Sequence, residues 1–463
     1  MQNRQLVINS IYYTVGEVLP RIIGFFLLPL LTRYLTPAEY GINSYTNTVM
    51  LFSLTLSTLS LNTFLLRNYY KEESPVDKRR IIGNIFLLML LTNAIVSGLE
   101  LLIFPGALMW LKIGIPFRPF FLLAIVNNFM EGVSIVPLLI YRIRQNARVF
   151  VLINAGRVLL QFGVTWMMLS RWHYGLEGVY VARIIVSIPF TLLCLGIVYR
   201  NAILRPNREQ MRKALQFSLP LLPGVLSYLF IMTFDRIVLE KSVGLDSLGL
   251  YSTAATLSLA LNIVVQGLYR AFEQKIFEKH GKPEYERITD ELYRYFIVCL
   301  FTGGFLMSIF SREVFLLITS SRFQSAYTLV PLLTAPVILN GFITFLSVLV
   351  IAGQRQILIT RANFLSLAVS IPSTLILIHY GGVYGAILSS AISFGIVVFF
   401  YLYHLRLRQS YVLSWGLLLL LLLAICEGMR WVSLPLLPTI AIKLGLAAGY
   451  IGFCILHFRI KFS

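Results

Sequence analysis

The stretch Tyr40-Gly41-Ile42-Asn43-Ser44 returns in similar form as Leu248-Gly249-Leu250-Tyr251-Ser252, at an offset of 208 residues (40 to 248). A second pair of stretches keeps almost the same period, since His173-Tyr174-Gly175 matches His379-Tyr380-Gly381 at an offset of 206 residues (173 to 379). The tripeptide Gly-Val-Tyr follows in both copies, at residues 178–180 and 382–384. Two distant anchors that agree on one period indicate that the chain contains an internal repeat.

Apolar segments surround these anchors along the whole chain. Hydrophobic residues make up 57% of the 463 residues, and charged residues make up only 13%, against about a quarter in soluble proteins. A membrane helix needs about 20 apolar residues. Runs of this kind are centred near residues 20, 55, 92, 129, 160, 188, 226, 259, 300, 339, 367, 393, 421 and 448. The composition therefore excludes a secreted or cytosolic enzyme, a nucleic-acid-binding protein and a disordered chain.

Six predicted spans in each copy of the repeat determine the expected architecture. An even number of spans gives both copies the same orientation, so the repeat is parallel, about an axis along the membrane normal. We expect an all-α polytopic membrane protein with about 14 transmembrane helices. Residues 1–205 form the N-terminal six-helix bundle, residues 206–408 form the C-terminal six-helix bundle, and residues 409–463 supply helices 13 and 14. The two bundles are expected to enclose a central cavity.

The positive charges indicate the orientation of these spans. The formal net charge is +19, and the Lys and Arg residues separate the apolar runs instead of gathering on one face. If the N-terminus is cytoplasmic, 25 of the 39 basic residues lie in cytoplasmic connections and 9 in outer ones. By the positive-inside rule, both termini are expected in the cytoplasm and the chain in the cytoplasmic (inner) membrane. The charge then needs no nucleic acid as a partner.

Motifs of catalysis and of ATP-driven transport are missing from the sequence. It contains no G-x-x-x-x-G-K-[ST] phosphate loop, no nucleophile elbow and no H-E-x-x-H motif. Its four cysteines lie inside apolar segments without the spacing of a metal site. We therefore expect that the protein is not an enzyme and that it binds neither a cofactor nor a metal ion. Coupling to H⁺ or to Na⁺ stays open.

Charged and amide side chains inside the spans predict a polar cavity, because a charge within the membrane needs a partner or water. In the spans concerned, such residues recur at intervals of three and four, which places them on one helical face. Arginine forks match phosphate oxygens in bidentate fashion. The candidate substrate-binding arginines are Arg21, Arg157, Arg183 and Arg270, and the candidate polar lining is Asn154, Gln161, Asn262 and Gln266.

Two questions about these residues stay open at this point. Some of the arginines could instead fix helix pairs or extend to the membrane surface, Arg270 among them. The carboxylates of Glu17 and Glu131 could be protonatable coupling groups or local partners of the arginines, and Glu17 lies four residues before Arg21.

Three stretches resemble a known family. The segment Pro29-Leu30-Leu31-Thr32-Arg33-Tyr34-Leu35-Thr36-Pro37-Ala38-Glu39-Tyr40-Gly41 resembles the first inter-helix signature of bacterial polysaccharide-type flippases. Ser218-Leu219-Pro220 and Phe234-Asp235-Arg236-Ile237-Val238-Leu239 are similar to the seventh helix of that family. By these residues the chain resembles the Wzx-like oligosaccharide flippases of the multidrug/oligosaccharidyl-lipid/polysaccharide (MOP) exporter superfamily, over roughly residues 5 to 405.

The resemblance implies a function and its partners. A flippase of this kind moves undecaprenyl-pyrophosphate-linked oligosaccharide repeat units across the cytoplasmic membrane by alternating access, for O-antigen, capsule or exopolysaccharide biosynthesis. The implied partners are the lipid-linked oligosaccharide, membrane lipids, and a polysaccharide polymerase with its chain-length machinery.

Two alternatives stay open, namely a cation-coupled multidrug exporter of the same superfamily and a membrane polymerase or ligase acting on lipid-linked glycans. The longest connections, near residues 67–80, 200–213 and 271–290, fall on the predicted cytoplasmic side. This position favours a carrier over a polymerase, which needs a catalytic loop on the outer face.

Overall fold

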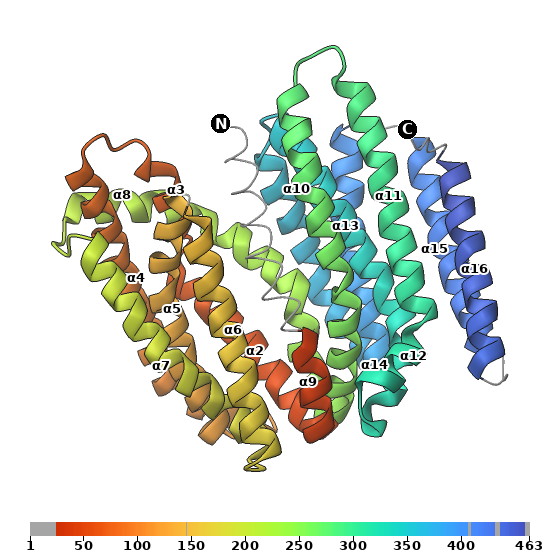
Figure 1. The fold of residues 1–463 in the computed structure, drawn as a ribbon, viewed down its shortest axis with the longest axis horizontal. Helices are drawn as coiled ribbons and strands as arrows, with labels where there is room; N and C mark the ends of the chain where they lie inside the picture. The colour runs from red at the N-terminus through yellow and green to blue at the C-terminus, as the bar shows by residue number, and fades with distance from the viewer. Residues whose placement is uncertain (1–24, 145, 406–408, 431–435, 459–463) are drawn as a thin grey trace. The chain divides into compact units, whose positions relative to one another are not determined.

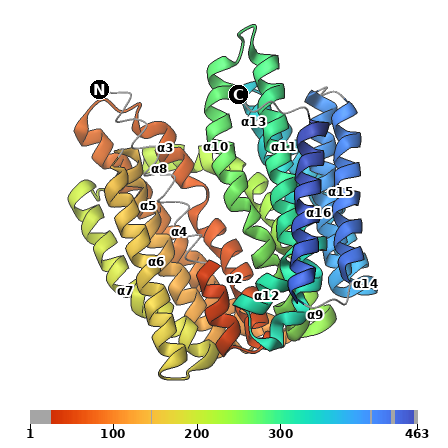
Figure 2. The same cartoon turned by 45° about the vertical axis from the view of Figure 1, so that its right-hand side comes forward.

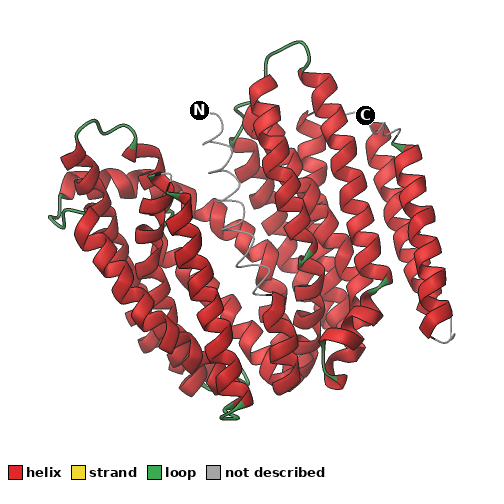
Figure 3. Ribbon diagram, viewed as in Figure 1, coloured by secondary structure: helices red, strands yellow, loops and turns green. Residues whose placement is uncertain are grey.

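The computed structural model describes residues 25–458, except residues 145, 406–408 and 431–435. Every regular element in these residues is a helix (Figure 3). Nine of the described helices are long and apolar enough to cross a membrane, or ten if the bent pair α2 (Pro37–Thr58) and α3 (Leu61–Tyr69) is one span. The chain is therefore an all-α, multi-pass membrane protein, which confirms the predicted fold class.

Two of the long helices each extend over more than one of the predicted spans. Helix α9 (Leu222–Leu259) is interrupted at Gly244, where φ is 83°, and α14 (Ile357–Leu405) is interrupted at Gly382, where φ is 52°. Glycine reaches positive φ without the steric cost that a side chain brings. The helices are thus consistent with fourteen spans, but the number stays a prediction, because most of the first span lies in residues 1–24, outside the described residues.

The interruptions fall at matching positions in the two copies of the repeat. Gly244 lies 208 residues after Thr36, the residue that precedes α2. Gly382 directly follows Gly381, the counterpart of Gly175, where α7 (Gly175–Asn201) begins with a φ of 55°. Each copy therefore starts a helix at the same point of its sequence.

The chain forms two compact units, Met1–Gly249 and Leu250–Ser463. The division into residues 1–205, 206–408 and 409–463 follows the sequence repeat and stays a prediction. In the first unit, α4 and α7 run beside helices α5 and α6 (Figures 1 and 2). The unit also contains α2, the first part of α9, and several elements shorter than these helices. Its elements after α3 are α4 (Pro75–Trp110), η1 (Phe117–Phe121), α5 (Leu122–Ile143), α6 (Ala147–Ser170), α7, α8 (Arg208–Ser218), η2 (Leu219–Leu221) and α9.

A capping box sets the start of α2. The Thr36 side chain accepts a hydrogen bond from the backbone N–H of Glu39 (3.2 Å), and the Glu39 carboxylate accepts one from the backbone N–H of Thr36 (2.8 Å). Pro37 occupies the first turn, where its missing N–H is not needed. The sequence Thr-Pro-Ala-Glu thus ends the preceding helix, Phe25–Tyr34, and begins α2.

Just inside α2, two glycines allow two helix starts to touch. A Cβ on Gly41 would meet the carbonyl oxygen of Leu245, and a Cβ on Gly249 would meet the carbonyl oxygen of Pro37. Leu245 and Gly249 lie 208 residues after Pro37 and Gly41, so the contact is reciprocal between counterparts of the repeat. A reciprocal contact of this kind is what a local two-fold axis produces.

The second unit packs around the aromatic residues of α11 and α13. The ring centroids of Phe296 and Phe345 are 5.1 Å apart, and both side chains are buried. The two C-terminal helices run side by side (Figures 1 and 2), and Lys443 of α16 donates to both carboxylate oxygens of Glu313 in α12, at 2.7 and 2.8 Å. The elements after α9 are α10 (Leu261–Lys279), α11 (Tyr285–Ile309), α12 (Ser311–Ile318), η3 (Ser321–Leu329), α13 (Val330–Ala352), α14, α15 (Gln409–Arg430) and α16 (Leu436–His457).

Candidate functional site

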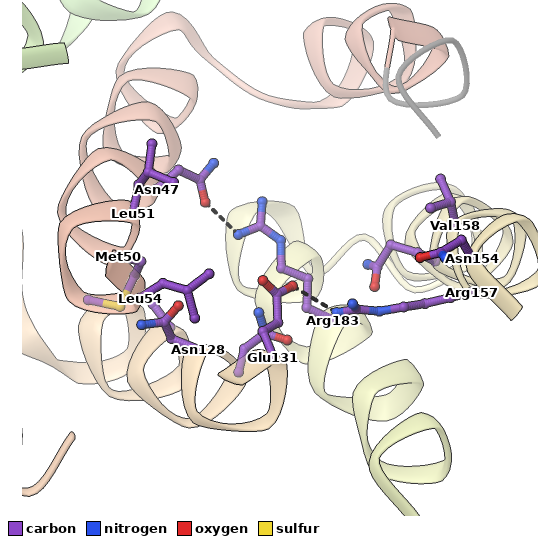
Figure 4. A pocket seen from close by; sticks show the side chains of 13 residues that line it. Asn47, Met50, Leu51, Leu54, Asn128, Glu131, Asn154, Arg157, Val158 and Arg183 are labelled. Atoms are coloured by element: carbon purple, nitrogen blue, oxygen red, sulfur yellow. Dashed lines mark hydrogen bonds and ion pairs between the residues drawn. The ribbon is translucent and has the colours of Figure 1, made fainter. Parts of the chain in front are cut away.

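A cavity of about 360 Å³ opens among four helices of the first unit (Figure 4). Helices α2, α5, α6 and α7 each contribute side chains to it. Three lining residues are charged, one acidic and two basic, and several others are amides. The complete lining is Asn47, Met50, Leu51, Leu54, Ala124, Asn127, Asn128, Glu131, Asn154, Arg157, Val158, Gln161 and Arg183.

Helix α6 presents its polar face to this cavity. Asn154, Arg157 and Gln161 follow one another at intervals of three and four residues, so their side chains lie on one side of the helix. The Asn154 amide also donates to the carbonyl oxygen of Phe150 (2.9 Å), and the Gln161 amide donates to the hydroxyl of Thr165 (3.0 Å). Both residues line the cavity.

Arg157 is bound on two sides. Its Nη2 donates to Oε1 of Glu131 in α5 at 2.7 Å (Figure 4), and its guanidinium lies over the Phe190 ring of α7, 4.7 Å from the centroid. The exposed fraction of the Arg157 side chain is 22%, and that of Glu131 is 38%, so the pair is accessible from the cavity. A guanidinium has five N–H donors. One ion pair therefore leaves Arg157 able to bind a second anion.

Arg183 has neutral partners instead. Its Nη1 donates to the amide oxygen of Asn47 (2.7 Å, Figure 4) and its Nη2 to the amide oxygen of Asn43 (2.9 Å), both in α2. The guanidinium also lies 5.2 Å from the ring centroid of Tyr180. Amides hold the guanidinium in place but do not cancel its charge. With Glu131 balanced by Arg157, the cavity keeps a net positive charge on Arg183.

Two asparagines of α5 connect the cavity to its walls. The Asn127 amide oxygen accepts a hydrogen bond from the hydroxyl of Ser187 (2.8 Å), and the Asn128 amide donates to the hydroxyl of Ser53 (2.8 Å). Asn128 is buried, so its amide lies at the base of the lining. These bonds fix the two amides of α5 against α7 and α2.

The structure brings five of the predicted site residues together. Arg157, Arg183, Glu131, Asn154 and Gln161 line one cavity, although their separation in sequence reaches 52 residues (131 to 183). The Glu131–Arg157 pair matches the reading of Glu131 as a local partner of an arginine. Whether these residues bind a substrate stays a prediction.

The other predicted residues do not join this cavity. Asn262 and Gln266 lie half-buried in α10, in the second unit, and are not part of the lining. The side chain of Arg270, also in α10, lies outside the described part of the structure. Glu17 and Arg21 belong to residues 1–24 and lie outside it as well. No cluster of His, Cys, Asp and Glu in the described ranges is suited to hold a metal ion.

The sequence prediction missed Asn43 and Asn47. The two asparagines lie four residues apart in the second predicted span, and the Asn47 amide donates to the Asn43 amide oxygen at 3.3 Å. The same kind of spacing, three or four residues, predicted the polar face of α6. Asn43 was noted only as part of the repeat, where its role in orienting Arg183 is not visible.

Two comparisons place the fold among known transporters. The lipid II flippase MurJ in an inward closed conformation superposes with a TM-score of 0.75 at 13% identity, covering 97% of this chain and 99% of that chain. An inward-facing multidrug resistance MATE family transporter of the MOP superfamily superposes with a TM-score of 0.69 at 13% identity, covering 86% and 97%. The chain therefore has the fold of MOP superfamily transporters.

Sequence comparisons identify the family. A protein of the Lsg locus of Haemophilus influenzae is 21% identical over 397 residues, which is 82% of this chain and 94% of that protein. An uncharacterized membrane protein of the same organism is 24% identical over 284 residues, or 59% of this chain and 66% of that protein. The family model described as polysaccharide biosynthesis protein matches residues 6–271, more than half of the chain. This chain therefore belongs to the polysaccharide biosynthesis protein family.

Proposed function

We propose that the protein is a flippase that moves undecaprenyl-pyrophosphate-linked oligosaccharide repeat units across the cytoplasmic membrane, for the biosynthesis of a surface polysaccharide. The observation that carries this proposal is the cavity of the first unit, where Arg183 has amide partners and no carboxylate among the described residues. A water-accessible arginine whose charge is not cancelled attracts an anion. The pyrophosphate of a lipid-linked glycan is such an anion.

The arrangement suits both parts of the proposed substrate. Arginine can bind phosphate oxygens through two parallel N–H donors. Arg157 and Arg183 come from adjacent helices and both line the cavity, so one pyrophosphate can contact the two guanidinium groups. The amides of Asn47, Asn127 and Gln161 can donate to and accept from sugar hydroxyls.

Export of a cationic drug is the second candidate, and the cavity charge argues against it. Two arginines and one glutamate give the lining a net charge of +1, which repels a cation at short range. A polymerase or ligase receives no support from the comparisons, because the similar solved structures are transporters.

The experiment that tests the proposal replaces Arg183 in the producing organism. Arg183→Ala is expected to reach the membrane at the normal level and to lower glycan export about 10- to 100-fold, since a hydrogen bond to a charged group is worth about 1.5–3 kcal/mol. Lipid-linked repeat units should accumulate on the cytoplasmic leaflet. The matched control is Arg208→Ala, which removes one exposed positive charge at the start of α8, away from the cavity. Normal export by Arg183→Ala at a normal membrane level would refute the assignment of this cavity.

A further inference from the structure

Glu100 is a carboxylate buried within a membrane-spanning helix. It lies in α4, its exposed fraction is 7%, and its Oε2 atom has no hydrogen-bond partner. It forms no ion pair with any residue that the structure describes. A buried carboxylate without a cation carries a desolvation cost of several kcal/mol, whereas the protonated acid is neutral. The environment of Glu100 therefore favours the acid.

Two side chains lie between Glu100 and the cavity. Ser53 of α2 lies beside the carboxyl group of Glu100, and the hydroxyl oxygen of Ser53 accepts a hydrogen bond from the Asn128 amide at 2.8 Å. Because that oxygen is the acceptor, the Ser53 O–H is available to donate to the carboxyl group. Asn128 in turn lines the cavity that holds Arg157 and Arg183. A change of charge on Glu100 thus reaches the cavity through two side chains.

The same face of α4 carries further buried polar groups without partners. Asn93, Ser97 and Glu100 follow one another at intervals of four and three residues, and all three are buried. The amide oxygen of Asn93 and the hydroxyl of Ser97 have no hydrogen-bond partner in the described part of the chain, although the Asn93 amide donates to the carbonyl oxygen of Phe129 (2.8 Å). Unpaired buried polar atoms in a row are suited to ordered water. This stripe gives a proton a polar environment beside the carboxyl group.

Several charged groups on the helices near α4 are bound to other residues. Helices α3 and α8 contact α4 near its start, where Asn84 bonds Gln210, about 24 Å of helix away from Glu100. Glu131 pairs with Arg157, and Arg183 is bound by two asparagines. On the elements that contact α4, the titratable and charged groups include Tyr45 on α2, Arg118 on η1, Glu131 on α5, and Tyr180 and Arg183 on α7. Glu240, on α9, accepts a hydrogen bond from the backbone N–H of Gly114.

We propose that Glu100 is a proton-binding site coupled to the cationic cavity through Ser53 and Asn128. An ionised Glu100 adds a negative charge close to the cavity and weakens the binding of an anion there. A protonated Glu100 removes that charge, so proton binding and anion binding strengthen each other. By linkage, the affinity of the cavity for an anion rises as the pH falls through the titration of Glu100. The coupling rests on the proposed function, because it requires an anionic ligand, whereas proton binding by Glu100 does not.

The first measurement tests proton binding alone. Infrared spectra of the full-length protein in lipid vesicles at neutral pH should contain the C=O stretching band of a protonated carboxylic acid. Glu100→Gln, which keeps the shape of the neutral acid, should lose that band. Glu209→Gln, an exposed glutamate of α8, should keep it. A wild-type spectrum identical to that of Glu100→Gln in this region would overturn the proposal.

The second measurement tests the coupling with inorganic pyrophosphate as the probe. Pyrophosphate itself titrates, so the informative quantity is the ratio of its Kd for wild type to its Kd for Glu100→Gln at each pH. We expect this ratio to rise about 5-fold or more from low to high pH, within the usual range of coupling between two sites. Ser53→Ala should keep the infrared band. When the same ratio of Kd values is measured in the Ser53→Ala background, with and without Glu100→Gln, it should change little with pH. A ratio that is constant with pH would overturn the coupling and leave the proposed function standing. Absence of pyrophosphate binding in every variant, with the infrared band retained, would support proton binding at Glu100 and contradict the proposed ligand.

Discussion

The two copies of the repeat use the same pair of helices in different ways. In the first copy, α6 and α7 carry Arg157 and Arg183 into a polar cavity. In the second copy, the two limbs of α14 occupy the corresponding stretch of sequence. The counterpart of Arg157 at the 206-residue offset is Asn363, and neither register of the Gly-Val-Tyr anchor gives Arg183 a charged counterpart, since the matching residues are Ile387 and Ser389.

Small hydroxyl residues join the two limbs of α14, and one of them, Ser389, is the counterpart of Arg183 at the 206-residue offset. The Ser366 hydroxyl donates to the carbonyl oxygen of Ser393 (2.7 Å), and the hydroxyls of Thr374 and Ser389 are hydrogen-bonded to each other. All four side chains are buried. A hydroxyl can satisfy its hydrogen bond against a neighbouring helix and needs no water, whereas a guanidinium needs several acceptors or an anion.

The spaces beside these helices differ accordingly. A groove of about 360 Å³ beside α14 equals the cavity of the first unit in volume, but its lining is apolar and contains Leu365, Ile392 and Phe399. The corresponding helices therefore differ in the polarity of the space beside them. Arg157 and Arg183 line a polar cavity in the first copy, whereas buried hydroxyl groups bond across the two limbs of α14 in the second.

The largest effect is expected from placing an arginine in the second copy. Ser389→Arg should destabilise the protein by about 3–5 kcal/mol, the cost of an uncompensated buried charge. Ser389 is buried, and its hydroxyl is bonded to that of Thr374 in the other limb of α14. The measurement is the amount of folded protein in the membrane, with Ser389→Ala as the uncharged control. Normal levels of Ser389→Arg would show that the second copy also tolerates charge.

The next effect concerns Arg157 and its counterpart. Arg157→Ala should lower glycan export about 10- to 100-fold, for the loss of one charged hydrogen bond, whereas Asn363→Ala should leave export unchanged. Arg157→Lys keeps the charge but loses the fork, so it should rescue export only in part. The double variant Glu131→Gln, Arg157→Ala separates the two roles of the arginine. Full export by this double variant would mean that Arg157 serves only to balance Glu131.

A smaller effect is expected where the two copies are alike. Gly41→Ala and Gly249→Ala should each destabilise the protein by about 1–3 kcal/mol, because a methyl group would press on a backbone carbonyl that cannot rotate away. Gly98→Ala is the control, since a Cβ there meets nothing. Thermal unfolding in detergent measures the three variants. Very unequal losses at Gly41 and Gly249 would contradict the reciprocal contact.

The smallest effect on the protein is expected from reporter fusions. They test the orientation of both copies of the repeat in the membrane. Reporter domains fused after residue 205 or after residue 463 should report a cytoplasmic location, because the connections on that side hold 25 basic residues against 9 on the other. An alkaline phosphatase that is fully active after residue 205 would reverse the orientation and contradict the parallel repeat.

Part of the candidate site could be predicted because helical periodicity is local. Intervals of three and four residues place Asn154, Arg157 and Gln161 on one face, whatever surrounds the helix. Glu100 gave a weaker signal, a single carboxylate in an apolar run without a basic residue three or four positions away. Its isolation became evident only when α2 and α5 were seen to cover it with neutral groups.

The amino-acid sequence by itself determined the membrane-spanning character, the repeat, and the polar faces of single helices, since each depends on composition or on spacing within one segment. Only the tertiary structure decided which faces meet. Arg183 is bound by Asn43 and Asn47, which lie 140 and 136 residues away in the chain, and this choice depends on the packing of α2 beside α7. Partners over such distances are set by the shapes and close packing of whole helices, which no local pattern encodes.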